Sequence, residues 1–378
     1  MRTIAVFMGT RPEAIKMAPV VRALGHSKSV RPVVVSTGQH REMLRQVVEL
    51  FQIPVHHDLD VMVPNQTLAG LTARLMTAID QTLDALRPDM ALVQGDTTTV
   101  LVAALACFYR RVPIGHVEAG LRTGDLAAPF PEEANRTLAG KLVSLHFAPT
   151  ERSRANLLRE GVSDEHVLVT GNTVIDALHI EAEQQAHPAV HAAVHGRINA
   201  LLGPGWNQRR FVLITGHRRE NFGDGFEQIC DALATLADRF PDVHLVYPVH
   251  LNPNVQGPVR QRLAGRANIH LIPPQDYREF VALMRACTLV LTDSGGVQEE
   301  APSLGKPVLV MRDTTERPEG LDAGTVRLVG ARREAIVDGV ARLLTDPAVY
   351  RAMAEAVNPY GDGKAAPRIV QRIERFLG

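Results

Sequence analysis

The sequence predicts an α/β protein made of two doubly wound domains, and three observations support this. The chain has 378 residues, more than one domain of usual size. Short apolar, β-branched runs alternate with longer helical patterns, which favours a parallel sheet covered by helices on both faces. The alternation restarts after a polar, alanine-rich stretch at residues 180–209. We therefore expect two sheets in succession, joined near residues 172–185.

The elements follow the same order in each half. In the first half, strands are expected at residues 4–8, 33–35, 90–93 and 114–117, and helices near 12–24, 40–51, 66–86 and 97–110. In the second half, strands are expected at residues 211–214, 243–246, 288–291 and 308–310, and helices near 226–238, 276–286, 296–304 and 331–344. A last helix near residues 365–377 follows the turn-forming segment 359–363.

Composition excludes several classes of partner. The 41 Lys and Arg balance the 41 Asp and Glu, so neither nucleic acid nor an anionic membrane surface is expected to bind. No apolar stretch reaches the roughly 18 residues of a membrane helix, and the first residues do not resemble a signal peptide. Cys107, Cys230 and Cys287 lie in or beside apolar runs, which is typical of buried, reduced thiols and a cytoplasmic location.

Small and ionisable residues follow nearly every strand, where doubly wound sheets bind ligands. The strongest anion signal is DSGGVQEE, residues 293–300, in which Ser294, Gly295 and Gly296 open a helix. Free N–H groups at such a helix end favour phosphate. Glu300, one turn further on, suits a ribose diol. The alternative is a tight turn with a solvated glutamate pair.

Cations also follow strands. Arg11 ends the first strand, Lys16 lies on the helix that Pro12 begins, and Arg317 lies in a loop. These side chains suit a diphosphate, and the alternative for Arg11 is a structural ion pair. The first strand–loop–helix lacks G-x-G-x-x-G, so no nicotinamide cofactor is expected.

Four residues are acid–base candidates. Asp96 and Glu118 end strands, Glu132 begins a helix, and His217 follows the first strand of the second half. Carboxylates and histidine are the usual proton carriers in active sites. Each has a plainer alternative: Asp96 as a helix cap, Glu132 as a partner of the helix dipole, and His217 as a structural histidine.

A possible metal motif is discounted. His187, His191 and His195 are spaced by four, but they lie far from the strand ends and no nearby Cys or carboxylate completes a ligand set. No metal is expected.

With these motifs, the chain resembles the non-hydrolysing bacterial UDP-N-acetylglucosamine 2-epimerases. The matching segments are collinear and cover nearly the whole chain: MGTRPEAIKMAPV (8–20), STGQHREML (36–44), QGDTTTV (94–100), HVEAGLRTGD (116–125), PFPEEANR (129–136), FAPTE (147–151), VTGNTVIDAL (169–178), TGHRRENFG (215–223), YPVHLNP (247–253) and DSGGVQEEAPSLGKPVLVMRDTTERPE (293–319). Ala127 and Ala128 replace bulkier residues that the family carries before residues 129–130.

The resemblance implies a GT-B-like fold of two Rossmann-like domains facing a cleft. Residues 1–172 then form the N-terminal domain, which contains the acid–base carboxylates and is completed by the helix at 362–378. Residues 173–361 form the C-terminal domain, which binds UDP. A homodimer without a cofactor is expected.

The resemblance also implies a role for each candidate residue. It assigns catalysis to Asp96, Glu118, Glu132 and His217. It assigns substrate binding to Arg11, Lys16, Arg136, Ser294, Gly295, Gly296, Glu300 and Arg317. A second UDP-N-acetylglucosamine molecule, acting as an activator, is expected at Gln39, His40, Arg74 and His250.

The implied reaction is reversible epimerisation at carbon 2 of UDP-N-acetylglucosamine, giving UDP-N-acetylmannosamine for cell-surface polysaccharide synthesis. In the family, UDP is eliminated to give 2-acetamidoglucal and then adds back. The alternatives are a hydrolysing 2-epimerase, an epimerase of a modified UDP sugar, and a GT-B glycosyltransferase.

Overall fold

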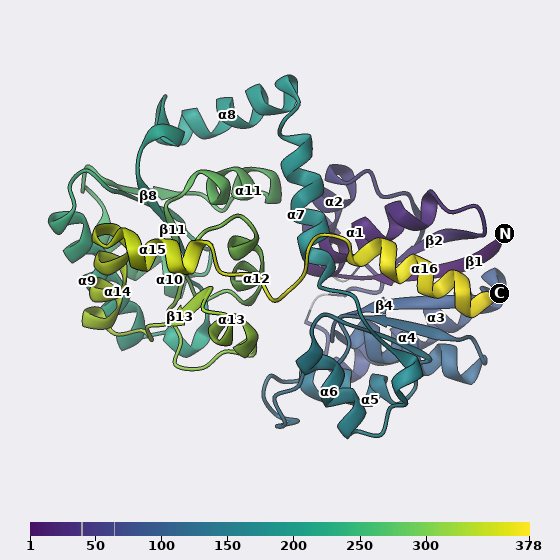
Figure 1. Cartoon of the computed structure of the whole chain (residues 1–378). Coiled ribbons are helices and arrows are strands. Elements are labelled where there is room, and N and C mark those ends of the chain that lie inside the picture. Colours follow the sequence, from purple (N-terminus) through teal and green to yellow (C-terminus); the bar gives the residue numbers. More distant parts are fainter. Residues whose placement is uncertain (39–40, 64) are drawn as a thin grey trace. The chain divides into compact units, whose positions relative to one another are not determined.

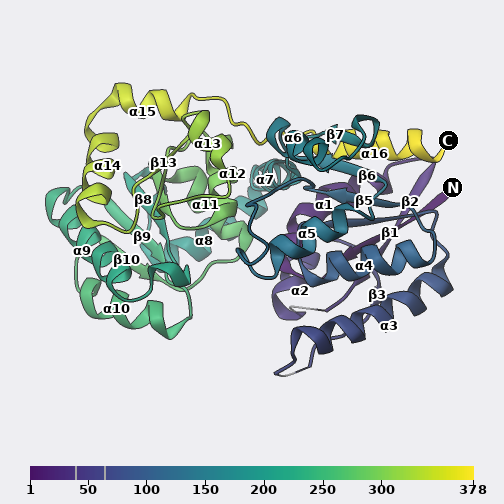
Figure 2. The same cartoon turned by 90° about the horizontal axis from the view of Figure 1, so that it is seen from below.

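Two parallel β-sheets organise the chain, one in each of two units. The computed structural model describes residues 1–38, 41–63 and 65–378. Unit 1 comprises Met1–Ala177 and Tyr360–Gly378, and unit 2 comprises Leu178–Pro359 (Figures 1 and 2). The predicted α/β class with two doubly wound sheets is confirmed. Across the described residues, no helix combines the length and apolarity needed to cross a membrane.

The sheet of unit 1 has seven strands in the order β3-β2-β1-β4-β5-β6-β7. They are β1 (Arg2–Met8), β2 (Val30–Ser36), β3 (Val55–Asp58), β4 (Met90–Gln94), β5 (Ile114–Val117), β6 (Leu145–Ala148) and β7 (Val167–Val169). The four strands predicted in this half are confirmed as β1, β2, β4 and β5, whereas β3, β6 and β7 were not predicted. The strand order reverses between β1 and β4, the usual position of a ligand site.

Helices cover the sheet of unit 1. They are α1 (Arg11–Gly25), α2 (Arg41–Leu50), α3 (Leu68–Leu86), α4 (Thr98–Tyr109), α5 (Glu132–Gly140), α6 (Glu151–Arg159) and α16 (Ala365–Leu377). Helix α7 (Thr173–Gln184) begins in unit 1 and ends in unit 2.

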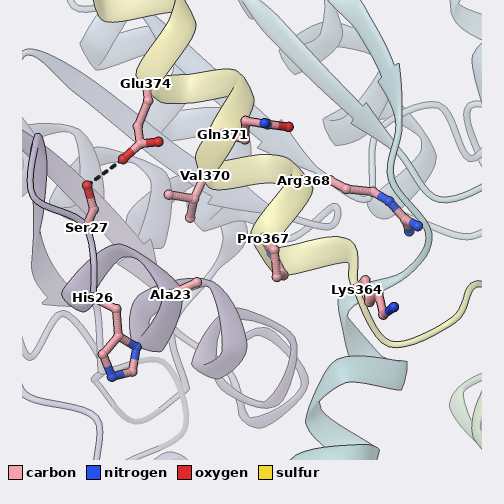
Figure 3. A pocket seen from close by; sticks show the side chains of 9 residues that line it. All are labelled: Ala23, His26, Ser27, Lys364, Pro367, Arg368, Val370, Gln371 and Glu374. Atoms are coloured by element: carbon pink, nitrogen blue, oxygen red, sulfur yellow. Dashed lines mark hydrogen bonds between the residues drawn. The ribbon is translucent and has the colours of Figure 1, made fainter.

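Helix α16, from the end of the chain, packs on α1 (Figure 3). The hydroxyl of Ser27 donates a 2.6 Å hydrogen bond to Glu374, drawn as a dashed line in Figure 3. At the other end of α16, the backbone N–H groups of Ala365 and Ala366 donate to the carboxylate of Asp176. These contacts attach α16 to unit 1.

Unit 2 has a six-stranded sheet in the order β10-β9-β8-β11-β12-β13, with the reversal between β8 and β11. Its strands are β8 (Phe211–Thr215), β9 (His244–Pro248), β10 (Ile269–Ile272), β11 (Leu289–Thr292), β12 (Val308–Val310) and β13 (Val326–Leu328). Its helices are α8 (Pro188–Leu202), α9 (Asp224–Arg239), α10 (Pro253–Leu263), α11 (Tyr277–Ala286), α12 (Gly295–Ser303), α13 (Pro318–Asp322), α14 (Arg333–Thr345) and α15 (Pro347–Ala354).

Both faces of the second sheet are buried. Val212, Leu213 and Ile214 in β8 each have 0% exposed surface. Successive strand side chains point to opposite faces, so apolar contacts cover the sheet on both sides. The strand ends and the loops that follow them are therefore the parts of the sheet that can meet a ligand.

Candidate active site

In unit 1, a buried carboxylate joins the loops that follow β1 and β4. Glu13 accepts 2.7 Å hydrogen bonds from the backbone N–H groups of Gly9 and Thr10, and a 2.6 Å bond from the hydroxyl of Thr97. Burial raises the pKa of Glu13, while these hydrogen bonds oppose the shift. Neighbouring Arg11 makes no side-chain hydrogen bond or ion pair within the described part of the chain, so the structural ion pair considered for it is not found there.

Glu118, directly after β5, has φ +66°, a left-handed conformation that non-glycine residues rarely adopt. Its buried carboxylate accepts hydrogen bonds from the ammonium group of Lys16, the side-chain amide of Gln94 and, at 2.9 Å, the amide of Asn172. Groups from three parts of unit 1 therefore fix its position. Unusual backbone geometry maintained by surrounding contacts is frequent at functional sites.

Arg136 connects Asp96 to the start of α5. Its Nη1 donates a 3.0 Å hydrogen bond to Asp96, and its Nε donates a 2.6 Å bond to the buried Glu133. Thr97, rather than Asp96, occupies the N-cap position of α4. The capping alternative for Asp96 is therefore wrong, because its carboxylate faces an arginine.

The candidate carboxylates of unit 1 influence one another electrostatically. Burial is the main cause that raises the pKa of Asp96; Arg136 and Lys16 oppose the shift, and the negative charges of Glu118 and Glu132 add to it. The Asp96 side chain is still 29% exposed, so a substrate can reach it. Glu132 is half-buried in the first turn of α5. This position also fits the alternative considered for it, an interaction with the positive end of the helix dipole.

In unit 2, His217 and Asp293 lie at the ends of adjacent strands β8 and β11. Asp293 has no exposed surface, and one of its oxygens accepts 2.8 Å hydrogen bonds from the backbone N–H groups of His217 and Arg218. Its other oxygen lies 3.4 Å from Nδ1 of His217. Burial lowers the pKa of His217, Asp293 raises it, and the nearby His250 lowers it further.

The N-terminus of α12 has the features of an anion site. Ser294 occupies the N-cap position, and its side chain makes no capping hydrogen bond. The guanidinium of Arg317 lies so close to Gly295 that a Cβ added there would be 2.5 Å from Nη1. Glu299, with 1% exposed surface, accepts a hydrogen bond from Nε of Arg317 and orients that side chain.

Glu300 lies one turn into α12, and the hydroxyl of Tyr277 donates a 2.7 Å hydrogen bond to it. A Cβ added at Gly296 would come no closer than 3.9 Å to the Glu300 carboxylate. The glutamate is 6% exposed, so the solvated pair considered from the sequence is wrong for this residue.

The candidates for the activator site are spread over both units. Gln39 and His40 lie outside the described residues. Arg74 donates a 3.0 Å hydrogen bond to the carbonyl of Val61 and another to Gln66. The ring of His250 stacks on His217, with ring centroids 5.3 Å apart and an interplanar angle of 17°.

Several residues that hold these groups were not assigned a role from the sequence. All except Tyr277 lie inside the sequence motifs described above, and that position could have identified them. Tyr277, on α11, lies outside every motif, so nothing in the sequence pointed to it. The residues are Gln94, Glu133, Asn172, Tyr277, Asp293 and Glu299. Among the described residues, no group of three or more His, Cys, Asp or Glu is arranged to hold a metal ion.

Comparisons with known proteins agree with these features. The family model described as UDP-N-acetylglucosamine 2-epimerase matches residues 22–374. The UDP-N-acetylglucosamine 2-epimerase of Yersinia pestis is 56% identical over 99% of this chain and 98% of its own length. The crystal structure of the UDP-GlcNAc 2-epimerase from Neisseria meningitidis bound to UDP-GlcNAc is 47% identical, has a TM-score of 0.92, and matches over 99% of this chain and 100% of that one.

A more distant solved structure is also similar. The UDP-GlcNAc 2-epimerase of Methanocaldococcus jannaschii, in complex with UDP-GlcNAc and UDP, is 31% identical, with a TM-score of 0.84 and coverage of 99% of each chain. Family model, sequence identity and fold thus agree over nearly the whole length. The chain belongs to the UDP-N-acetylglucosamine 2-epimerase family.

Proposed function

We propose that this protein interconverts UDP-N-acetylglucosamine and UDP-N-acetylmannosamine by eliminating UDP to give 2-acetamidoglucal and adding it back. The observation that carries this proposal is the buried carboxylate of Glu118, in a left-handed backbone conformation and bonded to Lys16, Gln94 and Asn172. Such a carboxylate is prepositioned for proton transfer.

Elimination follows from the chemistry of the sugar. The hydrogen on carbon 2 is not next to a carbonyl group, so enolisation cannot remove it. Loss of UDP from carbon 1 as the carbon 2 proton leaves gives the glycal. UDP then adds back to carbon 1 while carbon 2 is protonated on the opposite face, which completes the epimerisation. Acid–base groups are therefore needed on both faces of the sugar ring.

In this proposal the diphosphate binds at the N-terminus of α12. The backbone N–H groups of residues 294–296 and the guanidinium of Arg317 stabilise its negative charge as UDP leaves. Glu300 binds the ribose, with Tyr277 fixing its orientation. The further positive partners are Arg11, Lys16 and Arg136.

The proton-transfer roles fall to Asp96, Glu118, Glu132 and His217. Two features support them: the raised pKa of Asp96, which burial causes, and the orientation of His217 by Asp293. Asp96→Asn and Glu118→Gln test the assignment, with turnover expected to fall about 100-fold or more in each. Near-normal turnover in both variants would show it to be wrong.

We also propose that a second UDP-N-acetylglucosamine molecule binds as an activator at Gln39, His40, Arg74 and His250. The stacking of His250 on His217 supports this, since it would link an activator directly to an acid–base group. Stimulation of the reverse reaction by added UDP-N-acetylglucosamine is expected. Simple hyperbolic kinetics without stimulation would exclude the activator.

A homodimer in the cytoplasm, producing a precursor for cell-surface polysaccharide, completes the proposal. Exposed Phe108, Tyr109 and Leu138 lie on the adjacent helices α4 and α5, and large exposed apolar side chains on neighbouring elements support an interface there. The three free cysteines are buried, as suits a reducing compartment. Light scattering on the purified protein would measure the oligomeric state.

The deciding experiment is incubation with UDP-N-acetylglucosamine in deuterated water, without added metal, followed by proton NMR. UDP-N-acetylmannosamine at equilibrium, with deuterium on carbon 2 and little free UDP, is the expected result. Free UDP with N-acetylmannosamine would indicate the hydrolysing reaction instead. No reaction would overturn the proposed substrate and direct the search to modified UDP sugars or to a glycosyl acceptor.

A further inference from the structure

A cavity of about 370 Å³ in unit 2 lies among the end of α7, α8, α11 and the short turn at Trp206–Gln208. None of its lining residues belongs to the candidate active site. Its polar lining comes from the segment 185–207 and from α11, and consists of Gln185, His191, His195, Trp206, Asn207 and Arg285.

Trp206 contributes a hydrogen-bond donor that lacks an acceptor. The residue is 2% exposed, and its indole N–H has no hydrogen-bond partner among the described residues. The ring packs between His195 and Phe211, with centroid distances of 5.1 and 6.3 Å. Buried polar groups in folded proteins are nearly always paired, so an unpaired donor at a cavity indicates a missing partner that accepts hydrogen bonds.

The charged side chain that lines the cavity is positive. Arg285, exposed on α11, donates a 3.2 Å hydrogen bond to the neutral amide of Gln185, and the cavity lining includes no carboxylate. The carboxylates of Glu181 and Glu279, on the flanking helices, are bonded to other arginines. The charge of Arg285 is thus not balanced within the cavity.

Two stacked histidines also line the cavity. The rings of His191 and His195 stack with centroids 3.9 Å apart. Burial lowers the pKa of His195, and the neighbouring His191 and Arg285 lower it further. A negative group in the cavity would raise the pKa of His195 again, favouring its protonated form, and would accept the unpaired N–H.

We propose that this cavity binds a small organic anion through Arg285 and the indole N–H of Trp206, with His191 and His195 beside it. The ligand class is defined by an oxyanion group, a carboxylate or a phosphate, because both accept hydrogen bonds from guanidinium and indole donors. The site is independent of the proposed epimerase reaction. Two of its residues, His191 and His195, belong to the histidine spacing that was considered, and discounted, as a metal motif.

Trp206 is the only tryptophan in the chain, so its fluorescence reports on this cavity alone. The full-length protein, without nucleotide sugar, is titrated with inorganic phosphate and separately with succinate, at constant ionic strength set with sodium chloride. A saturable change in emission with at least one probe is expected, and the more effective probe distinguishes phosphate from carboxylate. The single indole N–H resonance in an NMR spectrum should move over the same concentration range.

Arg285→Gln removes the cation, and Arg260→Gln is its matched control. Both arginines are exposed in the last turn of a helix of unit 2, but Arg260 does not line the cavity. Arg285→Gln should weaken binding about tenfold, and Arg260→Gln should leave it unchanged. Unchanged circular dichroism would show that both variants fold. The proposal is overturned if neither probe acts beyond sodium chloride, or if Arg285→Gln binds as the wild type does.

Discussion

Nδ1 of His217 lies 3.4 Å from Oδ1 of Asp293, a carboxylate with no exposed surface. The other oxygen of Asp293 accepts the backbone N–H groups of His217 and Arg218. One buried residue at the end of β11 therefore fixes both the backbone position of His217 and the charge beside its ring. It does so because β8 and β11 are neighbours at the point where the strand order reverses.

Replacing Asp293 with asparagine should separate these two effects. The amide oxygen can still accept the backbone N–H groups, but the negative charge that raises the pKa of His217 is lost. We expect the titration of His217 to move to lower pH and turnover to fall at least about tenfold. NMR titration of the imidazole and the pH–rate profile measure both, with the exposed Asp338→Asn as control. An unchanged pH profile would refute the role of Asp293.

Asp96→Asn should reduce activity but increase stability. The pKa of Asp96 is raised in the fold, so its contribution to stability is fully present below its unfolded pKa and is lost as the pH rises through the folded value. At pH 7 the partly buried charge is unfavourable, and asparagine removes it. Urea denaturation should therefore show a higher free energy of unfolding than in the wild type.

Asp89→Asn is the matched contrast for that measurement. Hydrogen bonds from the backbone N–H of Thr3 and from Arg2 lower the pKa of Asp89, so its ionised form stabilises the fold at neutral pH. Its replacement should reduce the free energy of unfolding by about 1 kcal/mol. If both variants changed stability in the same direction, the pKa directions given for the two aspartates would be contradicted.

The buried His116 should make the fold sensitive to acid. A backbone carbonyl only accepts, so Nε2 of the neutral ring donates the 2.7 Å hydrogen bond to Gly95. Burial lowers the pKa of His116 to about 4, from 6.5. Its contribution to stability is therefore present above pH 6.5 and is lost between there and 4, on the order of 3 kcal/mol. Urea denaturation at several pH values should show that acid reduces the free energy of unfolding less in His116→Gln than in the wild type. The control His26→Gln, at an exposed position, should lose as much as the wild type.

Gly295→Ala tests the diphosphate site without changing a charge. The added Cβ would lie 2.5 Å from the guanidinium of Arg317 and so displace that group. The Michaelis constant for the UDP sugar should rise about tenfold. Gly257→Ala is the control, since that helical glycine has nothing within 4 Å of an added Cβ. A Michaelis constant equal to that of the wild type would argue against Arg317 as a diphosphate ligand.

The sequence was informative about which side chains reach the strand ends. Continuous apolar runs predicted the long central strands, because such strands are buried on both faces. The strands β7 and β13, with three residues each, are not fully buried, whereas the equally short β12 is a run of three buried apolar residues and was predicted. The strand β3 is exposed along its length and has no buried apolar face to detect.

Pairing between side chains was not predictable in the same way. Lys16 and Glu118 are 102 positions apart, and their contact depends on where α1 lies against the strand order of the sheet. Asn172 and Glu118 are 54 apart, and their contact also requires the left-handed backbone at Glu118. Residue types at strand ends therefore predicted the candidate site residues. Only the folded topology shows which other side chains form hydrogen bonds with them.

The placement of α16 has a consequence for synthesis of the protein. Residues 1–177 of unit 1 are made before unit 2, yet its α16 is made only after the whole of unit 2. The apolar surface of α1 that α16 covers therefore stays exposed, or shielded by a chaperone, while unit 2 is translated. Both chain ends lie close together on unit 1 (Figures 1 and 2). A circular permutant that begins with residues 360–378 would deliver α16 first and shorten that wait.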